Sequence, residues 1–250
     1  MTEFAEGQQP EKLKRGEGVG RFLGEHVLLP ALDILSNRVE QFHITSVGLE
    51  NLSEAKNRSC LFVCNHLKPV SAISKQSQLS PDAFVLQHVV EQATGVSPKI
   101  IAKAGDGWWS KNEWYRAFQE KSLPIIRELM TSAGLLPINK NPGTSNIDFF
   151  HEARKVKNDG DSMVIFPEGN WYSDFSVDHP LSEGAALLAK KYDLPIIPVY
   201  IKNANDWKRG QVVYISFGEP FEAVGEGKEG RHQTTEVIRS KIAELQANHS

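Results

Sequence analysis

Two stretches of sequence, CLFVCNH (residues 60–66) and SMVIFPEG (residues 162–169), decide the architecture that the chain predicts. Each begins with a short apolar run rich in β-branched and aromatic residues, which is typical of a buried strand. Each run leads directly into polar side chains, Asn65 and His66 in the first and Glu168 in the second. Functional residues of α/β sheets gather where strands end, so these stretches indicate a site as well as a fold.

Strands and helices alternate on either side of these two stretches. We expect further strands over residues 42–48, 99–104, 135–138, 195–201 and 211–218. We expect helices over residues 81–92, 112–132, 145–158, 182–192 and 234–246. The first helix has a capping Ser80, and the last is capped at Thr234 or Thr235. This alternation predicts a single α/β domain with a mixed, mostly parallel central sheet flanked by helices.

Composition limits the classes of function. The 250 residues are 40% hydrophobic and carry a formal net charge of -3, which argues against a nucleic-acid partner because such proteins usually have a basic surplus. Two cysteines, Cys60 and Cys64, cannot build a disulfide framework, and this favours the reducing cytoplasm. They lie on one face of a predicted strand, where we expect small core residues and not a redox pair.

The chain contains no segment that predicts a membrane-spanning helix. Its longest uncharged stretch, residues 129–139, has 11 residues, whereas a spanning helix needs about 20 apolar ones. Residues 1–19 are expected to form a mobile arm without a signal peptide, and residues 20–37 an apolar helix. The apolar stripe of that helix, from Phe22 to Leu35, either packs on the core or lies on a membrane surface. We expect a cytoplasmic location, with peripheral contact to the inner face of the membrane as an open alternative.

The polar residues at the strand ends have both a catalytic and a structural interpretation. Imidazole titrates near neutral pH, so His66 at a strand end is a candidate general base, although a capping or core histidine is the alternative. Residues 167–169, Pro-Glu-Gly, taken alone favour an ordinary turn from a strand into a helix.

Five ordered blocks together carry a resemblance. They are Asn65-His66 with a later Asp, GLLPINK (134–140), VIFPEG (164–169), a Gly-Ala-rich helix from Gly184, and PIIPV (195–199). Over roughly residues 42–245 the chain resembles the lysophospholipid (PlsC-like, 1-acylglycerol-3-phosphate O-) acyltransferase family. The resemblance implies a glycerolipid acyltransferase-like fold and an acyltransferase domain over residues 38–250. It implies an enzyme of phospholipid biosynthesis that moves an acyl chain from acyl-CoA or acyl-carrier protein to the hydroxyl of a lysophospholipid or glycerol-phosphate-like acceptor. No cofactor or metal is expected besides the acyl thioester.

The resemblance assigns His66 as the base and requires an acid that orients it. The family places that acid five positions after the histidine, where this chain has Ser71. Residues 67–80 look like an inserted loop, which costs little free energy, so we expect Asp82 to take the place of the acid. Ser71 or no partner at all is the alternative, which would make the chain a catalytically degenerate lipid- or partner-binding relative.

By the same resemblance, residues Asn139, Lys140, Glu168, Gly169 and Asn170 contact the acceptor. Lys140 stands where the family usually has an arginine, and Trp171 stands at the position of a second one. Lysine keeps the charge but loses the bidentate fork that suits phosphate, so the acceptor is either held differently or is not a simple phosphomonoester.

An aromatic cluster, Trp108, Trp109 and Trp114, either meets a membrane or acyl chain or forms a satellite core. The sequence leaves open the identity of the acceptor, the acyl length, the choice of thioester donor and the oligomeric state.

Overall fold

The computed structural model describes residues 37–70, 80–103, 134–138 and 146–249, together with positions 125, 128, 130 and 131. The predicted arm, the stripe from Phe22 to Leu35 and the cluster of Trp108, Trp109 and Trp114 lie outside the described residues, as does most of the helix predicted at 112–132.

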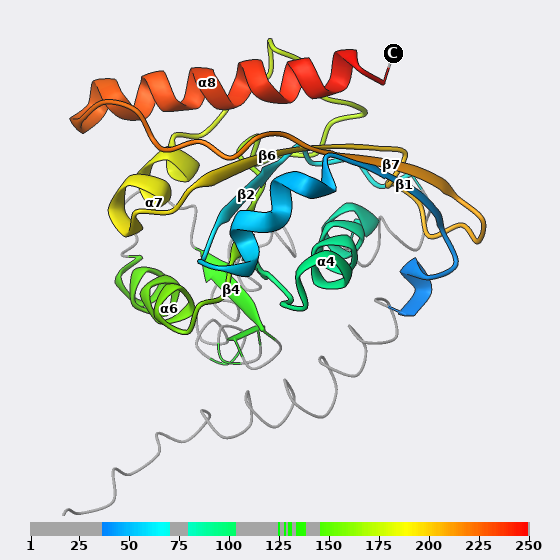
Figure 1. Ribbon diagram of the computed structural model, residues 1–250, viewed down its shortest axis with the longest axis horizontal. Coiled ribbons are helices and arrows are strands. Elements are labelled where there is room, and N and C mark those ends of the chain that lie inside the picture. The colour runs from blue at the N-terminus through cyan, green and yellow to red at the C-terminus, as the bar shows by residue number, and fades with distance from the viewer. Residues whose placement is uncertain are drawn as a thin grey trace, which may run out of the picture.

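Within the described residues, one seven-stranded sheet forms the centre of the molecule (Figure 1), in the order β1-β7-β6-β2-β5-β3-β4. The strands are β1 (His43–Val47), β2 (Leu61–Cys64), β3 (Lys99–Lys103), β4 (Leu135–Ile138), β5 (Met163–Ile165), β6 (Ile196–Lys202) and β7 (Val212–Phe217). Neighbouring strands run parallel except for β6 and β7, which are antiparallel. Each strand overlaps a predicted one, and the predicted α/β class with a mostly parallel sheet is confirmed.

Helices cover both faces of the sheet because its central strands are apolar on both sides. Along β2, Phe62 and Cys64 face one core, whereas Leu61 and Val63 face the other. The first core is covered by the 3-10 helix η2 (Leu49–Lys56), which was not predicted, and by α4 (Pro81–Thr94). The second is covered by α6 (Ile147–Asn158), α7 (Gly184–Tyr192) and α8 (Gly227–Ala247). Figure 1 shows α8 and α4 on opposite sides of the sheet.

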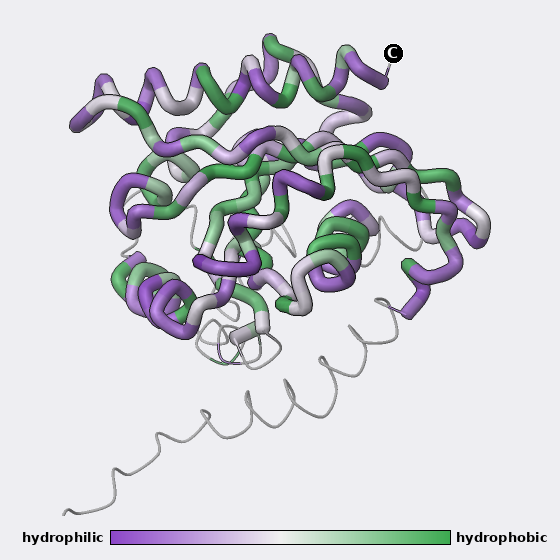
Figure 2. The backbone as a smooth tube through the Cα atoms, viewed as in Figure 1, coloured by the Kyte–Doolittle hydropathy of each residue, from purple (hydrophilic) through white to green (hydrophobic). Residues whose placement is uncertain are grey.

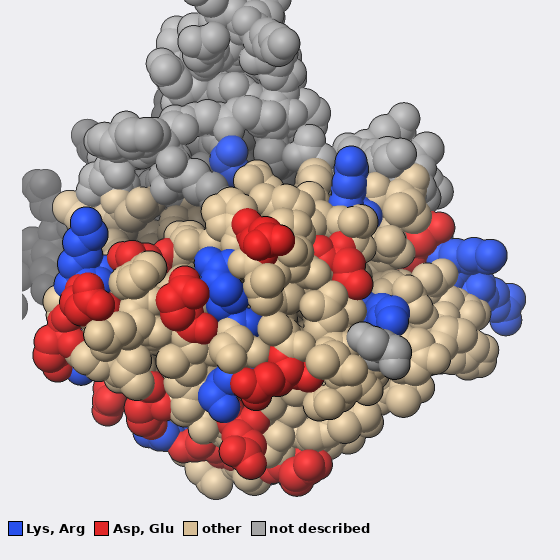
Figure 3. Space-filling view, turned by 90° about the horizontal axis from the view of Figure 1, so that it is seen from above, with Lys and Arg blue, Asp and Glu red and all other residues tan. Residues whose placement is uncertain are grey.

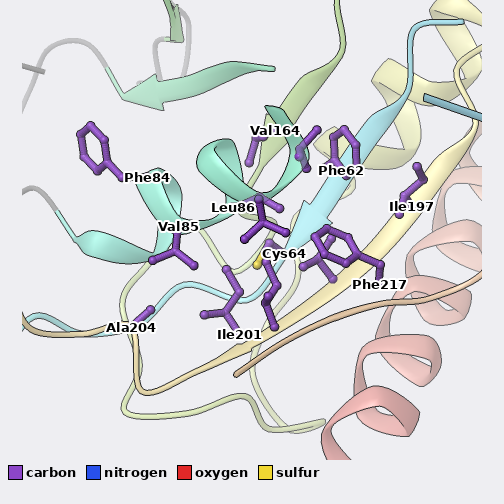
Figure 4. Packing of buried hydrophobic residues seen from close by; sticks show 14 of the residues in the cluster. Phe62, Cys64, Phe84, Val85, Leu86, Val164, Ile197, Ile201, Ala204 and Phe217 are labelled. Atoms are coloured by element: carbon purple, nitrogen blue, oxygen red, sulfur yellow. The ribbon is translucent and has the colours of Figure 1, made fainter. Parts of the chain in front are cut away.

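The first core fixes α4 against the strands that carry the polar loops. Side chains of β2 and β6 meet Val85 and Leu86 of α4 in Figure 4, and Cys64 lies among them. Both cysteines are buried and unpaired, and desolvation raises the pKa of the Cys60 thiol to about 12. The prediction that they are core residues is therefore confirmed. Figure 2 shows that hydrophobic residues are concentrated in the strands and on the inner sides of the helices.

The C-terminal helix begins earlier than predicted, at Gly227, so the predicted caps are wrong. Thr234 and Thr235 lie inside α8, and their hydroxyls donate to the carbonyl oxygens of Gly230 and Arg231, one turn before them. A threonine hydroxyl can bond within a helix as readily as it caps one, so the residue type alone does not mark the start. Gly230 packs so tightly that a Cβ there would lie 2.4 Å from the carbonyl carbon of Gly225.

The described surface carries charges of both signs, as the near-neutral composition of the sequence predicts. On the α8 side of the molecule, Lys and Arg are interspersed with Asp and Glu (Figure 3). Among the helices that the structure describes, none is both long enough and apolar enough to span a membrane.

Candidate active site

The site forms where β2 and β5 end side by side. These parallel neighbours place Val63 opposite Ile165, so the residues that follow leave the sheet at the same edge. The two loops stay paired beyond the strands. The N–H of Tyr172 donates to the carbonyl oxygen of His66 (3.1 Å), and the N–H of Lys68 donates to that of Tyr172 (2.7 Å). This short ladder brings the loop after β5 alongside His66.

Asp82 reaches the same place from the first turn of α4. Its carboxylate is fully buried, and Oδ2 lies 2.8 Å from Nδ1 of His66. Oδ2 also accepts the N–H of Leu67 (2.7 Å), and Oδ1 accepts the N–H of Ala83 (2.8 Å). The partial positive charge at a helix N-terminus adds to these bonds in stabilising an anion. The structure therefore brings together His66 and Asp82, which are 16 residues apart; Ser71 lies outside the described residues.

Ser80 helps to close the segment between them. It occupies the N-cap position of α4 but makes no side-chain cap, because its hydroxyl donates to the carbonyl oxygen of Leu67 (3.1 Å). The predicted cap position is therefore confirmed, although Ser80 makes no side-chain capping bond. The bond that replaces it ties the residue before α4 to the residue after His66, which holds both ends of the segment in place.

Both ring nitrogens of His66 are hydrogen-bonded. Nε2 accepts a hydrogen bond from the indole Nε1–H of Trp171, and the ring stacks on Phe166 at 4.2 Å between centroids. Since an indole N–H can only donate, Nε2 carries the lone pair and Nδ1 carries the hydrogen that points at Asp82. This is the tautomer that a general base needs if Nε2 is to take the proton.

The carboxylate of Glu168 holds the backbone of His66. Its Oε2 accepts the N–H of His66 (2.7 Å), and its Oε1 lies 2.9 Å from Nδ1 of His179. Only 1% of the Glu168 side chain is exposed, and this desolvation raises the pKa of the carboxyl, although both bonds favour the ionised form. Sequence reasoning placed Glu168 in the wall of the acceptor pocket; the structure shows that its carboxylate fixes the main chain of His66.

His179 is a residue of the site that the sequence did not predict. Its ring stacks on Tyr172 with 3.6 Å between centroids. The guanidinium of Arg239, in α8, donates to the carbonyl oxygens of Val177 and His179 and thereby ties this loop to the helix. No spacing in the sequence indicates the pair, because the contact depends on the path of the loop over α8.

The remaining predicted residues have different positions. Gly169 has a φ of +63°, and its N–H donates to the carbonyl oxygen of Phe166 (3.1 Å), so it forms the left-handed turn after β5. Asn170 is exposed on that turn. Asn139 and Lys140 lie outside the described residues.

Asn65, next to the histidine, is structural. Its buried side-chain amide donates to the carbonyl oxygen of Ile201 (3.0 Å), and its Oδ1 accepts the N–H of the same residue (2.8 Å). These two bonds extend the pairing of β2 with β6 past the end of β2 and fix the place at which His66 leaves the sheet.

A histidine whose Nδ1 faces a buried carboxylate, at the ends of two parallel strands, is the arrangement that the resemblance implied. A sequence model of the Acyltransferase family matches residues 43–202, and the chain belongs to this family. It is 28% identical over 159 residues to the chloroplastic 1-acyl-sn-glycerol-3-phosphate acyltransferase BAT2 of Brassica napus; the match covers 63% of this chain and 37% of that protein. The chain thus spans well under half the length of that relative. The crystal structure of PlsC, the 1-acyl-sn-glycerophosphate (LPA) acyltransferase of Thermotoga maritima, aligns with 94% of this chain and 85% of its own, at 18% identity and a TM-score of 0.47.

Proposed function

We propose that this chain transfers an acyl group from acyl-CoA or acyl-carrier protein to the hydroxyl of a lysophospholipid or glycerol-phosphate-like acceptor. The observation that carries the proposal is the hydrogen bond between Nδ1 of His66 and the buried carboxylate of Asp82 in a chain of the Acyltransferase family. The acceptor class is supported by the activity for which the Brassica napus relative is named.

In the proposed reaction, His66 acts as the general base. A hydroxyl is a weak nucleophile near neutral pH, so Nε2 takes its proton while the oxygen attacks the thioester carbonyl carbon. The tetrahedral intermediate then collapses, the carbon–sulfur bond breaks, and the imidazolium returns the proton to the leaving thiolate. The products are an ester and a free thiol, and the sequence of steps uses no covalent acyl-enzyme, cofactor or metal.

Asp82 and Glu168 have separate positioning roles in this scheme. Asp82 keeps the hydrogen on Nδ1 and stabilises the imidazolium that forms on proton transfer. Glu168 accepts the backbone N–H of His66. The position of His66 is therefore fixed through both its side chain and its main chain. Asn139, Lys140, Gly169 and Asn170 remain proposed contacts of the acceptor.

The test is acyl transfer by the purified full chain with His66→Ala. Palmitoyl-CoA and palmitoyl-acyl-carrier protein serve as donors, and lysophosphatidic acid, lysophosphatidylcholine and glycerol 3-phosphate as acceptors. We expect kcat to fall about 10²- to 10⁴-fold, the usual contribution of a general base. The matched control is His43→Ala, an exposed histidine on the edge strand β1 that should leave the rate unchanged. Full activity in His66→Ala would contradict the proposal.

A second candidate, a catalytically degenerate lipid-binding protein, is favoured by one observation: Trp171 occupies the lone pair that the base would use. Binding of lysophosphatidic acid without turnover by any donor in the same assay would support it.

Contact with a membrane surface is part of the proposal, since the acceptor is amphiphilic and residues 22–35 carry an apolar stripe. Flotation with phosphatidylglycerol vesicles tests it, and removal of residues 1–36 should abolish any flotation that is seen.

A further inference from the structure

We infer that Trp171 guards the base: its indole N–H covers Nε2 of His66 until an acceptor hydroxyl displaces it, which keeps water from hydrolysing the acyl thioester. This inference rests on the proposed function. It starts from one contact, the hydrogen bond from the Trp171 indole to the nitrogen that must receive the proton. No hydroxyl can bind Nε2 while that bond exists, because the nitrogen has a single lone pair.

The indole is aimed at the base by its backbone. The N–H of the next residue, Tyr172, bonds the carbonyl oxygen of His66, and its carbonyl oxygen bonds the N–H of Lys68. The two rings then meet edge to face, with 5.7 Å between centroids and 60° between planes. The partly buried indole can leave Nε2 by rotating about its side-chain bonds, and the backbone ladder stays intact.

The guard distinguishes an acceptor from water by binding energy. Both can replace the indole as a donor to Nε2, so the exchange of hydrogen bonds alone favours neither. An acceptor also binds through groups remote from its hydroxyl, and this energy can move the indole from the base. Water has no such remote contacts and gains only the hydrogen bond, so it displaces the indole less often than an acceptor does.

The reaction that the guard suppresses is simple. Water would lose a proton to Nε2 as its oxygen bonds to the thioester carbonyl carbon. The carbon–sulfur bond would then break, and the thiolate would take the proton from His66, giving a fatty acid and a free thiol. This hydrolysis consumes the donor without acylating anything, and it uses the same base as the transfer reaction.

The first test observes the hydrogen bond between Trp171 and His66 by NMR and does not depend on turnover. In the unliganded full chain labelled with ¹⁵N-tryptophan, the indole N–H signal that Trp171→Phe removes should be shifted from the free position. His66→Ala should return it to that position. Trp207, whose ring packs on Phe42 and Phe84, is the control signal and should not move. Lysophosphatidic acid, added below its critical micelle concentration, should move the Trp171 signal in the direction that His66→Ala does. A Trp171 signal that neither His66→Ala nor saturating lysophosphatidic acid moves overturns the inference.

The second test measures the partition between transfer and hydrolysis. Trp171→Phe keeps the bulk of the ring but loses the donor. It should raise thiol release from palmitoyl-CoA without acceptor about two- to tenfold, the equivalent of one net hydrogen bond. Trp171→Ala should raise it further and lower the ratio of transfer to hydrolysis, whereas Trp207→Phe should match the wild type. Unchanged hydrolysis in both Trp171 variants of an active protein overturns the guard. A wild-type chain that neither transfers nor hydrolyses contradicts the proposed function and the guard with it, and the indole signal then reports only whether lysophosphatidic acid displaces Trp171 from His66.

Discussion

Two histidine–carboxylate pairs lie within the same site, and by local geometry they are nearly identical. The distance from Nδ1 to oxygen is 2.8 Å in His66–Asp82 and 2.9 Å in His179–Glu168. About a fifth of each histidine side chain is exposed, and each carboxylate is buried. Neither distance nor burial therefore tells which of the two pairs performs chemistry.

The pairs differ in what their remaining polar atoms contact. Asp82 takes its other bonds from the backbone of Leu67 and Ala83, which fix the carboxylate, and the second nitrogen of its histidine is a hydrogen-bond acceptor. The second oxygen of Glu168 instead bonds the backbone N–H of His66. The second pair is thus a support for the first. The two pairs are told apart by what each carboxylate also holds: the backbone of Leu67 and Ala83 in the first pair, and the backbone of the other histidine in the second.

Of the changes that test this comparison, Asp82→Asn should have the largest effect on the rate of acyl transfer. Asparagine keeps one acceptor oxygen and replaces the other with an NH₂ that only donates, whereas Asp82 accepts backbone N–H groups at both oxygens. The variant loses the charge that stabilises the imidazolium in the proposed reaction, and with its NH₂ toward Nδ1 it also leaves a hydrogen on Nε2 where the proposed base needs a lone pair. We expect kcat to fall about 10³- to 10⁴-fold with little change in the KM for the acceptor, measured by steady-state acyl transfer. A variant with the wild-type rate would remove the orienting role of Asp82.

Glu168→Ala should act mainly on stability. It removes the partner of the part-buried backbone N–H of His66, which costs about 1–3 kcal/mol in the free energy of unfolding by urea. Glu168→Gln is the matched control. Its amide oxygen can accept the same N–H, and its NH₂ can donate to the other tautomer of His179, so most of the stability should remain. Equal losses in the two variants would contradict the support role.

His179→Ala should have a smaller effect on the rate than any change at His66. The residue positions Glu168 and does not face the acyl carbonyl in the proposed reaction, so kcat should fall only about two- to tenfold, the rate equivalent of one ordinary hydrogen bond. A loss as large as that of His66→Ala would make the second pair catalytic and invert the comparison.

The smallest effect is a dependence of stability on pH. Burial raises the pKa of Glu168 above its ordinary value of 4.5, so the native state holds this proton more tightly than the unfolded chain does. The associated stability is present in full below the ordinary pKa and is lost as the pH rises through the native one. The free energy of unfolding of the wild type, relative to Glu168→Gln, should therefore fall as the pH rises from below 4.5 through the raised pKa of Glu168. A difference that rises over this range would contradict the sign of the shift.

Much of the fold followed from local patterns. Short apolar runs bounded by polar residues predicted the strands, because a strand buried on both faces needs apolar side chains at every position. The alternating elements predicted the mostly parallel sheet. The start of α8 was missed, because Thr234 and Thr235 can bond either as caps or within a helix, and the close packing of Gly225 and Gly230 decides between the two.

The sequence by itself determined that His66 and Glu168 follow strands, and the parallel arrangement then brought them to one edge of the sheet. It favoured Asp82 over Ser71 as the partner of His66 but could not settle the choice, since chain spacing does not fix where a long segment returns. The position of α4, packed on β2 through Val85 and Leu86, decided that Asp82 reaches His66. The contact of Trp171 with His66 and the pairing of His179 with Glu168 were likewise decided only by the tertiary structure, because both depend on how the loop after β5 lies against β2 and α8.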